Sequence, residues 1–206
     1  MANIHLTDFQ TQYDGRCKKC FMRSEKCICS LIPVIENKTR LTVLMHFKEA
    51  YKTTNTARLA HLCLKNSEVL IRGLPQQKID FSKILQPDHE VLFLTLHEKS
   101  QILSPELIQG LKKPVQLIVP DGTWSQVARV GKREPALQNS IWVQLPAGPP
   151  SGYKLRHEHH EEGLSTLEAI ARCFGAIESL QIQKQLEDVF YEMVQRTLET
   201  RPQNRF

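Results

Sequence analysis

The chain has 206 residues, of which 41% are hydrophobic and 24% charged, and its formal net charge is +5. This length suits one ordinary domain with at most a small appendage, and it can bury a core without cross-links. The longest apolar runs are only as long as strands, and the N-terminus lacks the regions of a signal peptide. We therefore expect a cytoplasmic protein with reduced cysteines and no membrane partner. The basic bias is compatible with a nucleic-acid partner but does not establish one.

Four of the six cysteines lie within thirteen positions near the N-terminus, as Cys17-x-x-Cys20 and Cys27-x-Cys29. In a reducing compartment, four thiolates at these spacings can close a tetrahedron around zinc. Unrelated thiols and a redox pair are the alternatives. We expect a structural zinc knuckle in an N-terminal segment, residues 1–34, that precedes a larger domain, residues 35–206. Basic residues crowd the knuckle and would suit phosphates, although lysines usually mark a solvated surface: Arg16, Lys18, Lys19, Arg23 and Lys26.

Apolar runs and capping signals predict the remaining elements in chain order. Strands are predicted at 41–47, 69–71, 91–96, 115–119 and 141–145. Helices are predicted at about 54–64, from Ser104-Pro105, from about 123, after the Ser165-x-x-Glu168 capping box, and at about 180–198. Cys63 is expected to be buried in the first of these helices. The alternation of strands and helices favours an α/β domain with a mostly parallel sheet and helices on both faces.

The stretch from Val115 to Ser125 is the most informative in the chain. A strand buried on both faces runs into the turn Pro120-Asp121-Gly122, and ligands bind outside the carboxyl ends of strands in open α/β sheets. The alternative is an ordinary strand-to-helix turn with Trp124 as a core aromatic. The helix predicted from about residue 123 places Trp124, Val127 and Ala128 together on an apolar face and Arg129, Lys132 and Arg133 on the other side.

Polar residues at the ends of the predicted strands are expected to converge on one edge of the sheet, namely His46, Glu49, Thr95, His97, Asp121, Thr123 and Ser151. Asn55 and Thr56 precede a helix, where capping is their usual role. The His- and Glu-rich run 157–162 lacks the spacing of a metal-binding helix, and we interpret it as a solvated surface.

Several of these motifs together resemble the DTW-domain family. They are the C-x-x-C and C-x-C knuckle, His46-x-x-Glu49, Asn55-Thr56, Asp121-Gly-Thr-Trp124, Ser151-x-Tyr153-x-Leu-Arg156 and Leu164-Ser-Thr-Leu-Glu-Ala169. The resemblance covers about residues 15 to 175. It implies a fold related to the SPOUT class, with S-adenosylmethionine bound at a knotted part of the sheet. It also implies that residues 35–206 form the catalytic DTW domain.

The implied reaction moves the 3-amino-3-carboxypropyl group of S-adenosylmethionine to a ring nitrogen of a tRNA uridine, expected in the variable loop, and releases methylthioadenosine. A methyltransferase of the same broad fold and a non-catalytic zinc-containing RNA-binding module are the alternatives. Asp121, at the end of a strand, is expected to take or orient the proton of the uridine nitrogen. Trp124 is expected to stack on the uracil or lie against the sulfonium.

The resemblance also assigns residues to three groups. The catalytic group is Asp121, Thr123 and Trp124. The donor site is Thr95, Leu96, Pro120, Asp121, Gly122, Ser151, Tyr153, Arg156, Leu164, Ser165 and Thr166, with Arg156 or the capped helix start meeting the donor carboxylate. The pocket is shaped by His46, Glu49, Asn55, Thr56 and Arg129. The knuckle and the cations Arg129, Lys132 and Arg133 are expected to bind the phosphate backbone of the tRNA.

Overall fold

A parallel sheet forms the centre of the computed structural model, which describes residues 3–6, 15–76, 78–153 and 163–199. The sheet has six strands in the order β2-β1-β5-β3-β6-β4, and each neighbouring pair is parallel. The strands are β1 (Arg40–His46), β2 (Ser67–Arg72), β3 (Glu90–Leu94), β4 (Gln101–Ile102), β5 (Val115–Asp121) and β6 (Ile141–Gln144). The predicted α/β class is confirmed.

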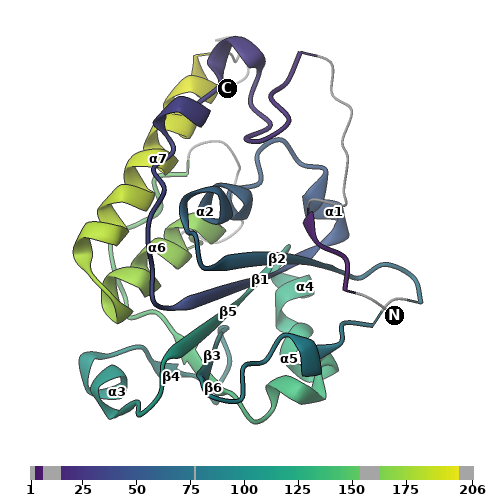
Figure 1. Ribbon diagram of the computed structural model, residues 1–206, viewed down its shortest axis with the longest axis vertical. Helices are drawn as coiled ribbons and strands as arrows, with labels where there is room; N and C mark the ends of the chain where they lie inside the picture. Colours follow the sequence, from purple (N-terminus) through teal and green to yellow (C-terminus); the bar gives the residue numbers. More distant parts are fainter. Residues whose placement is uncertain (1–2, 7–14, 77, 154–162, 200–206) are drawn as a thin grey trace.

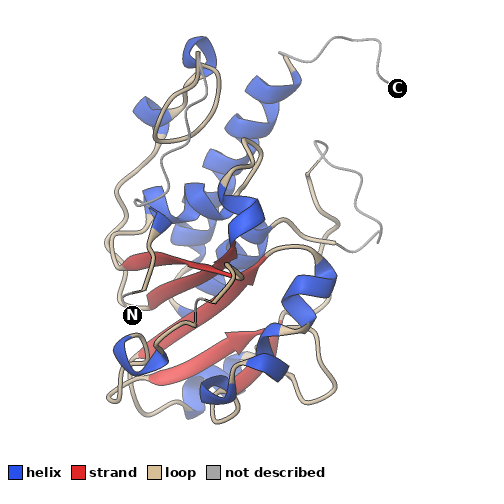
Figure 2. Cartoon of the chain, turned by 90° about the vertical axis from the view of Figure 1, so that its right-hand side faces the viewer, coloured by secondary structure: helices blue, strands red, loops and turns tan. Residues whose placement is uncertain are grey.

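Helices cover both faces of this sheet. They are α1 (Phe47–Ala50), α2 (Ala57–Cys63), α3 (Pro105–Gly110), α4 (Trp124–Ala128), α5 (Val130–Arg133), α6 (Thr166–Ile177) and α7 (Leu180–Leu198). Helices α2, α6 and α7 lie on one side, and α4 and α5 lie on the other (Figures 1 and 2). Within the described ranges, no helix is both long enough and apolar enough to cross a bilayer.

Strand β5 is covered on both faces, and all seven of its residues are buried. Leu117 and Val119 belong to the core cluster shared with α2, α6 and α7, whereas Ile118 belongs to the cluster that contains Val130 and Trp142 on the opposite face. A strand covered on both faces favours apolar side chains at successive positions, rather than at alternate ones. Gln116 is a polar exception, and its buried amide donates to Oγ1 of Thr42 and to the carbonyl of Ile84, both at 3.0 Å. The expected strand at this place is confirmed.

Three details differ from the sequence-based prediction. The helix predicted from about residue 123 is broken at Arg129 into α4 and α5, and Trp124, the first residue of α4, is 41% exposed. The apolar face predicted for it was wrong, because the segment meets the sheet through Val130 and Gly131 instead. Strand β4 and helix α1 were not predicted. Strand β4 consists of only two residues, both exposed, and α1 continues directly from β1.

The substitution Gly131→Ala, which adds one methyl group, tests the close approach of α5 to the sheet. A Cβ atom on Gly131 would lie 2.6 Å from Cη2 of Trp142, whose indole N–H donates to the carbonyl of Leu137. Gly131→Ala should therefore lower the free energy of unfolding by about 1–3 kcal/mol, as overpacked core substitutions do. Gly110→Ala is the control, because a Cβ atom there meets nothing within 4 Å and alanine favours a helix. Equal urea midpoints for the two variants would contradict this packing.

Candidate functional site

Asp121 lies at the carboxyl end of β5, and its side chain joins three elements. The residue is only 4% exposed. Its Oδ2 atom accepts a hydrogen bond from Nδ2 of Asn55 at 2.7 Å, and its Oδ1 atom accepts one from Oγ1 of Thr166 at 2.5 Å. Hydrogen bonds to a carboxylate are stronger than those between neutral groups. The end of β5 and the starts of α2 and α6 are therefore held at one point.

The starts of α2 and α6 are also bonded directly to each other. Oγ1 of Thr56, the residue that precedes α2, accepts the backbone N–H of Leu167 at 3.3 Å. The amide of Glu168 donates to Oγ of Ser165, also at 3.3 Å. Two of the first three amides of α6 are thus engaged within the chain. This reduces what the helix start can offer to an anion.

The predicted capping box at Ser165 is confirmed, and its glutamate has a second role. The backbone N–H of Ser165 donates to Oε2 of Glu168 at 2.8 Å. The same carboxylate accepts the hydroxyl of Ser151 at 2.7 Å and the N–H of Gly152 at 2.8 Å. Glu168 therefore fixes the loop that follows β6 to the start of α6. The sequence signals only the cap, because the loop partners are 17 and 16 residues away.

Tyr153 closes this loop over the segment before α2. Its hydroxyl donates to the carbonyl of Thr54 at 2.7 Å, and its ring packs against Phe190 of α7 with centroids 5.7 Å apart. The structure gives Tyr153 a place in the wall of the site, and its contact with the donor remains a prediction. Arg156, the other expected donor residue of this motif, lies outside the described residues, as does the 157–162 run.

Polar groups at the ends of β1 and β2 extend the site along the sheet edge. Nδ1 of His46 accepts the amide of Lys48 at 3.2 Å, and burial lowers the pKa of His46, with Arg72 and Lys48 adding to the effect. Glu49 is buried and paired with Nζ of Lys52 at 2.5 Å. A neutral imidazole and a paired carboxylate therefore line this part of the edge.

Arg72 is a site residue that sequence reasoning missed. It is the register partner of His46, and its guanidinium donates to the carbonyls of Leu44 and Gln126, at 3.1 and 3.3 Å. Burial lowers the pKa of Arg72, while the charge of Asp121 acts in the opposite direction. The only signal was a basic residue at the end of a short strand, which is common on surfaces.

The Gly122-Thr123 turn is shaped by Gln126. The amide of Thr123 donates to Oε1 of Gln126 at 2.9 Å, and a Cβ atom on Gly122 would lie 2.7 Å from that oxygen. A Cβ atom at position 122 would therefore displace the Gln126 side chain that holds the turn. Thr123 and Trp124 are exposed just beyond this turn. The alternative of Trp124 as a core aromatic was wrong.

The other predicted residues differ in exposure. Thr95 is buried after β3, where its amide donates to the carbonyl of Val143 at 2.9 Å, and Leu96 beside it is exposed. Leu164 is half-buried next to Ser165, and Arg129 is exposed between α4 and α5. The structure thus brings Asn55, Thr56, Asp121 and Thr166 into one hydrogen-bonded group.

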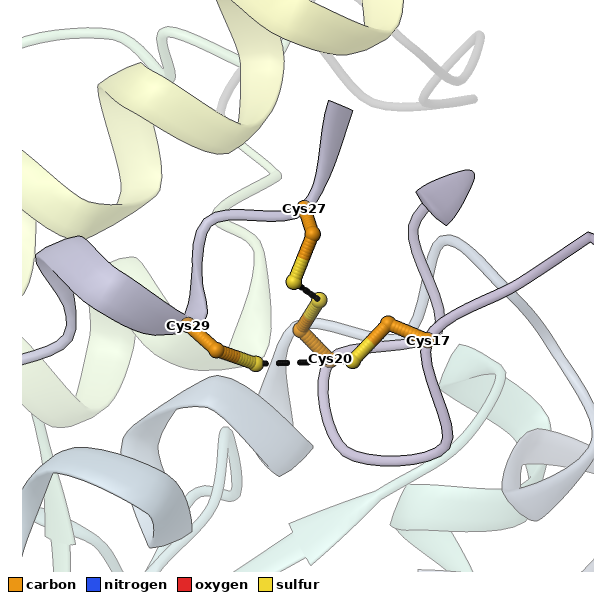
Figure 3. A group of neighbouring side chains, drawn as sticks. All are labelled: Cys17, Cys20, Cys27 and Cys29. Atoms are coloured by element: carbon orange, nitrogen blue, oxygen red, sulfur yellow. Dashed lines mark hydrogen bonds between the residues drawn. The ribbon is translucent and has the colours of Figure 1, made fainter. Parts of the chain in front are cut away.

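The four N-terminal cysteines form a second candidate site. Their Sγ atoms point toward one another (Figure 3) and all lie within 4.8 Å, with Cys17 and Cys29 at 3.5 Å and Cys20 and Cys27 at 3.7 Å. Tetrahedral zinc at its usual bond length would hold its sulfur atoms about 3.8 Å apart. The cluster therefore fits such an ion, and the four cysteines are free thiols.

The thiols of this cluster are not equivalent. Burial acts to raise the pKa of Cys17, but the backbone N–H groups of Cys20 and Lys19 outweigh it and lower the pKa to about 7. Burial raises the pKa of Cys20 and of Cys29. Of the basic residues nearby, Lys26 pairs with Glu199 at 2.6 Å and Arg16 donates to the carbonyl of Phe21. Part of this positive charge is therefore used within the chain.

The arrangement defines an α/β protein with a buried carboxylate at the carboxyl edge of a parallel sheet and a four-cysteine cluster near its N-terminus. The model of the DTW domain matches residues 14–198. This chain therefore belongs to the DTW-domain family.

Curated relatives carry related names. The chain is 27% identical to tRNA-uridine aminocarboxypropyltransferase 2 of Drosophila melanogaster, with 80% of this chain and 67% of that protein covered. It is 26% identical to tRNA-uridine aminocarboxypropyltransferase A of Arabidopsis thaliana, with 93% of this chain and 84% of that protein covered. The Macaca fascicularis relative, tRNA-uridine aminocarboxypropyltransferase 2, is 23% identical, and the chain spans only 56% of its length.

A solved structure supports the fold. It is described as the SAM-dependent rRNA:acp-transferase Tsr3 from Vulcanisaeta distributa. The two chains superpose with a TM-score of 0.52 at 16% identity, covering 79% of this chain and 82% of that one. At this level of identity the likeness concerns the fold alone.

Proposed function

We propose that this chain transfers the 3-amino-3-carboxypropyl group of S-adenosylmethionine to a ring nitrogen of a tRNA uridine. The family membership and the names of the relatives support this activity. The observation that carries it in the structure is the buried Asp121, held by Asn55 and Thr166 at the sheet edge where ligands of α/β proteins bind. A uridine of the variable loop remains the expected target.

The main task of the protein in this reaction is to select which carbon of the sulfonium the uridine nitrogen attacks. The uridine nitrogen gives its proton to solvent water and bonds to the carbon of the aminocarboxypropyl arm next to sulfur. The bond between that carbon and sulfur breaks, and methylthioadenosine leaves with the electron pair. Three carbons are attached to the sulfonium, so the protein selects the product by holding one of them in line with the nitrogen. The exposed indole of Trp124 suits stacking on the uracil.

We infer that Asp121 orients the reactants and does not remove the proton. Both of its oxygens accept hydrogen bonds from groups of the chain, and these come from two different helix starts. Such bonds stabilise the charged carboxylate and fix its direction. A general base must instead reach the proton that it takes, within about 3.2 Å. The two hydrogen bonds of Asp121 therefore support an orienting role.

Two finer features belong to this proposal. A knotted core of the SPOUT kind is proposed from the family membership, and β5 lies between β1 and β3 in the sheet. The exposed cations Arg129, Lys132 and Arg133 follow the Asp121 turn and support a contact with the tRNA backbone. A cytoplasmic location remains an expectation. Binding of tRNA that stayed equally tight at severalfold higher salt would argue against this contact.

A paired-label assay tests the reaction. With tRNA that lacks the modification, label in the aminocarboxypropyl arm of S-adenosylmethionine should enter the tRNA, and label in the methyl group should remain in methylthioadenosine. A methyltransferase would give the opposite pattern. A binding module would transfer neither label, and either of these results would reject the proposal.

Asp121→Asn should reduce kcat about 100-fold while the shape of the pH–rate profile is kept. The substitution removes the negative charge, so the bonds from Asn55 and Thr166 lose their charge assistance and hold the side chain less firmly, and the reactants lose their alignment. Thr166→Val, which removes one of these bonds and leaves the carboxylate, should act in the same direction. Asp88→Asn, at an exposed carboxylate, is the control. Loss of the acid limb of the profile in Asp121→Asn alone would identify Asp121 as the base.

We also propose that the cysteine cluster binds one zinc ion as a structural site. Its donor set and sulfur spacing support this choice. The protein purified under reducing conditions should contain about one zinc per chain by elemental analysis, and Cys17→Ala should lose it because three thiolates hold the ion less firmly. Cys63→Ala, at a buried thiol outside the cluster, should retain the metal. A wild-type protein free of zinc would refute the assignment.

A further inference from the structure

The residue after Cys20 is fixed by the loop that carries the cysteines. Phe21 has a φ of +64°, a left-handed conformation that residues other than glycine adopt with strain, and its side chain is buried. Its amide donates to the carbonyl of Cys17 at 2.9 Å, and its carbonyl accepts Nη1 of Arg16 at 3.0 Å. These bonds determine where the aromatic ring points.

The ring of Phe21 covers a buried guanidinium. Arg58, the second residue of α2, is 3% exposed, and its Cζ atom lies 3.4 Å from the centre of the ring. Its Nη2 atom donates to the carbonyl of Ala50 at 2.8 Å. A cation stacked on an aromatic face away from water gains more than an exposed one. The stacked pair therefore fixes the first turn of α2 against the cysteine segment.

The same turn of α2 sets the direction of the Asn55 amide. The backbone N–H of Arg58 donates to Oδ1 of Asn55 at 3.0 Å, which leaves Nδ2 of Asn55 facing Asp121 at 2.7 Å. A continuous set of contacts thus runs from Cys20 through Phe21, Arg58 and Asn55 to Asp121. Its members come from the knuckle, from α2 and from the sheet.

We propose that Phe21 and Arg58 are positioning residues that hold the Asn55 amide against Asp121. The cysteine segment then forms a structural part of the site, and its loop conformation determines how firmly Asp121 is held. The catalytic consequence rests on the proposed transfer reaction. The structural consequence, a firmer Arg58–Asn55 hydrogen bond, does not rest on that reaction.

Two variants and one matched control test the proposal. Phe21→Leu removes the aromatic face, and Arg58→Lys keeps the charge but loses the planar group that stacks. Phe81→Leu is the control, because Phe81 has the same 6% exposure as Phe21 but belongs to the core cluster on the opposite face of the sheet. Hydrogen exchange of the Arg58 amide is measured by NMR, together with kcat and the KM for the donor.

In Phe21→Leu, exchange of the Arg58 amide should be about tenfold faster than in Phe81→Leu, since the bond to Asn55 opens more often. Kcat should fall about tenfold with little change in KM. Asn55→Ala combined with Phe21→Leu should be no slower than Asn55→Ala alone, because both changes remove the same support. Arg58→Lys should lower kcat in the same way with the cysteine loop unchanged.

Equal exchange rates of the Arg58 amide in Phe21→Leu and Phe81→Leu would overturn the proposal. A double variant whose loss of kcat equals the product of the losses in Phe21→Leu and Asn55→Ala would also overturn it. If Phe21→Leu does not fold, Arg58→Lys decides by the same two readouts. A wild-type protein that transfers neither label would reject the proposed function alone. The comparison of exchange rates would still decide whether the knuckle supports Asn55.

Discussion

The burial of one carboxylate is the constraint on which the rest of this site depends. A buried charge is costly unless polar partners replace the water that it loses. Asp121 obtains such partners from Asn55, 66 residues before it, and from Thr166, 45 residues after it. The parallel register that pairs Asp121 with Met45 brings the end of β5 beside the segment leading to α2. The fold and the site are therefore specified by the same contacts.

A second carboxylate, Glu168, organises the other side of the site. It accepts hydrogen bonds from Ser165 within its own helix and from Ser151 and Gly152 in the loop after β6. Thr56 then receives the amide of Leu167 from the adjacent turn. A group that caps a helix for stability thus also fixes the position of a loop that belongs to the family motif. Structural and functional requirements coincide at these residues.

The parts of the molecule that depend on local patterns could be predicted from the sequence. The continuous apolar run of β5, the Pro105 start of α3 and the Ser165 capping box are such parts, and each is confirmed. The cysteine spacing likewise predicted the cluster that the structure shows. In each case a short stretch of sequence contains the whole signal, either the periodicity of a helix or strand or the spacing of metal ligands.

The parts that depend on distant contacts could not be predicted. The stacking of Arg58 on Phe21 joins segments 37 positions apart in the sequence, and the bonds of Arg72 reach from β2 to β1 and α4. The contact of Gly131 in α5 with Trp142 of β6 likewise joins two elements of the sequence that no local pattern links. A basic side chain has the same appearance in sequence whether it is solvated or enclosed. Tertiary packing alone decides between the two.

The hydroxyl of Tyr153 and the carbonyl of Thr54, which meet at 2.7 Å, are 99 residues apart. The bond from Leu167 to Thr56 spans 111 residues. Each of the loops that these bonds close contains β2, β3, β5 and β6. The bonds therefore depend on where the sheet places those strands. A change that shifts one strand of the sheet also shifts the hydrogen bonds of the site, even when it lies far from the site in the sequence.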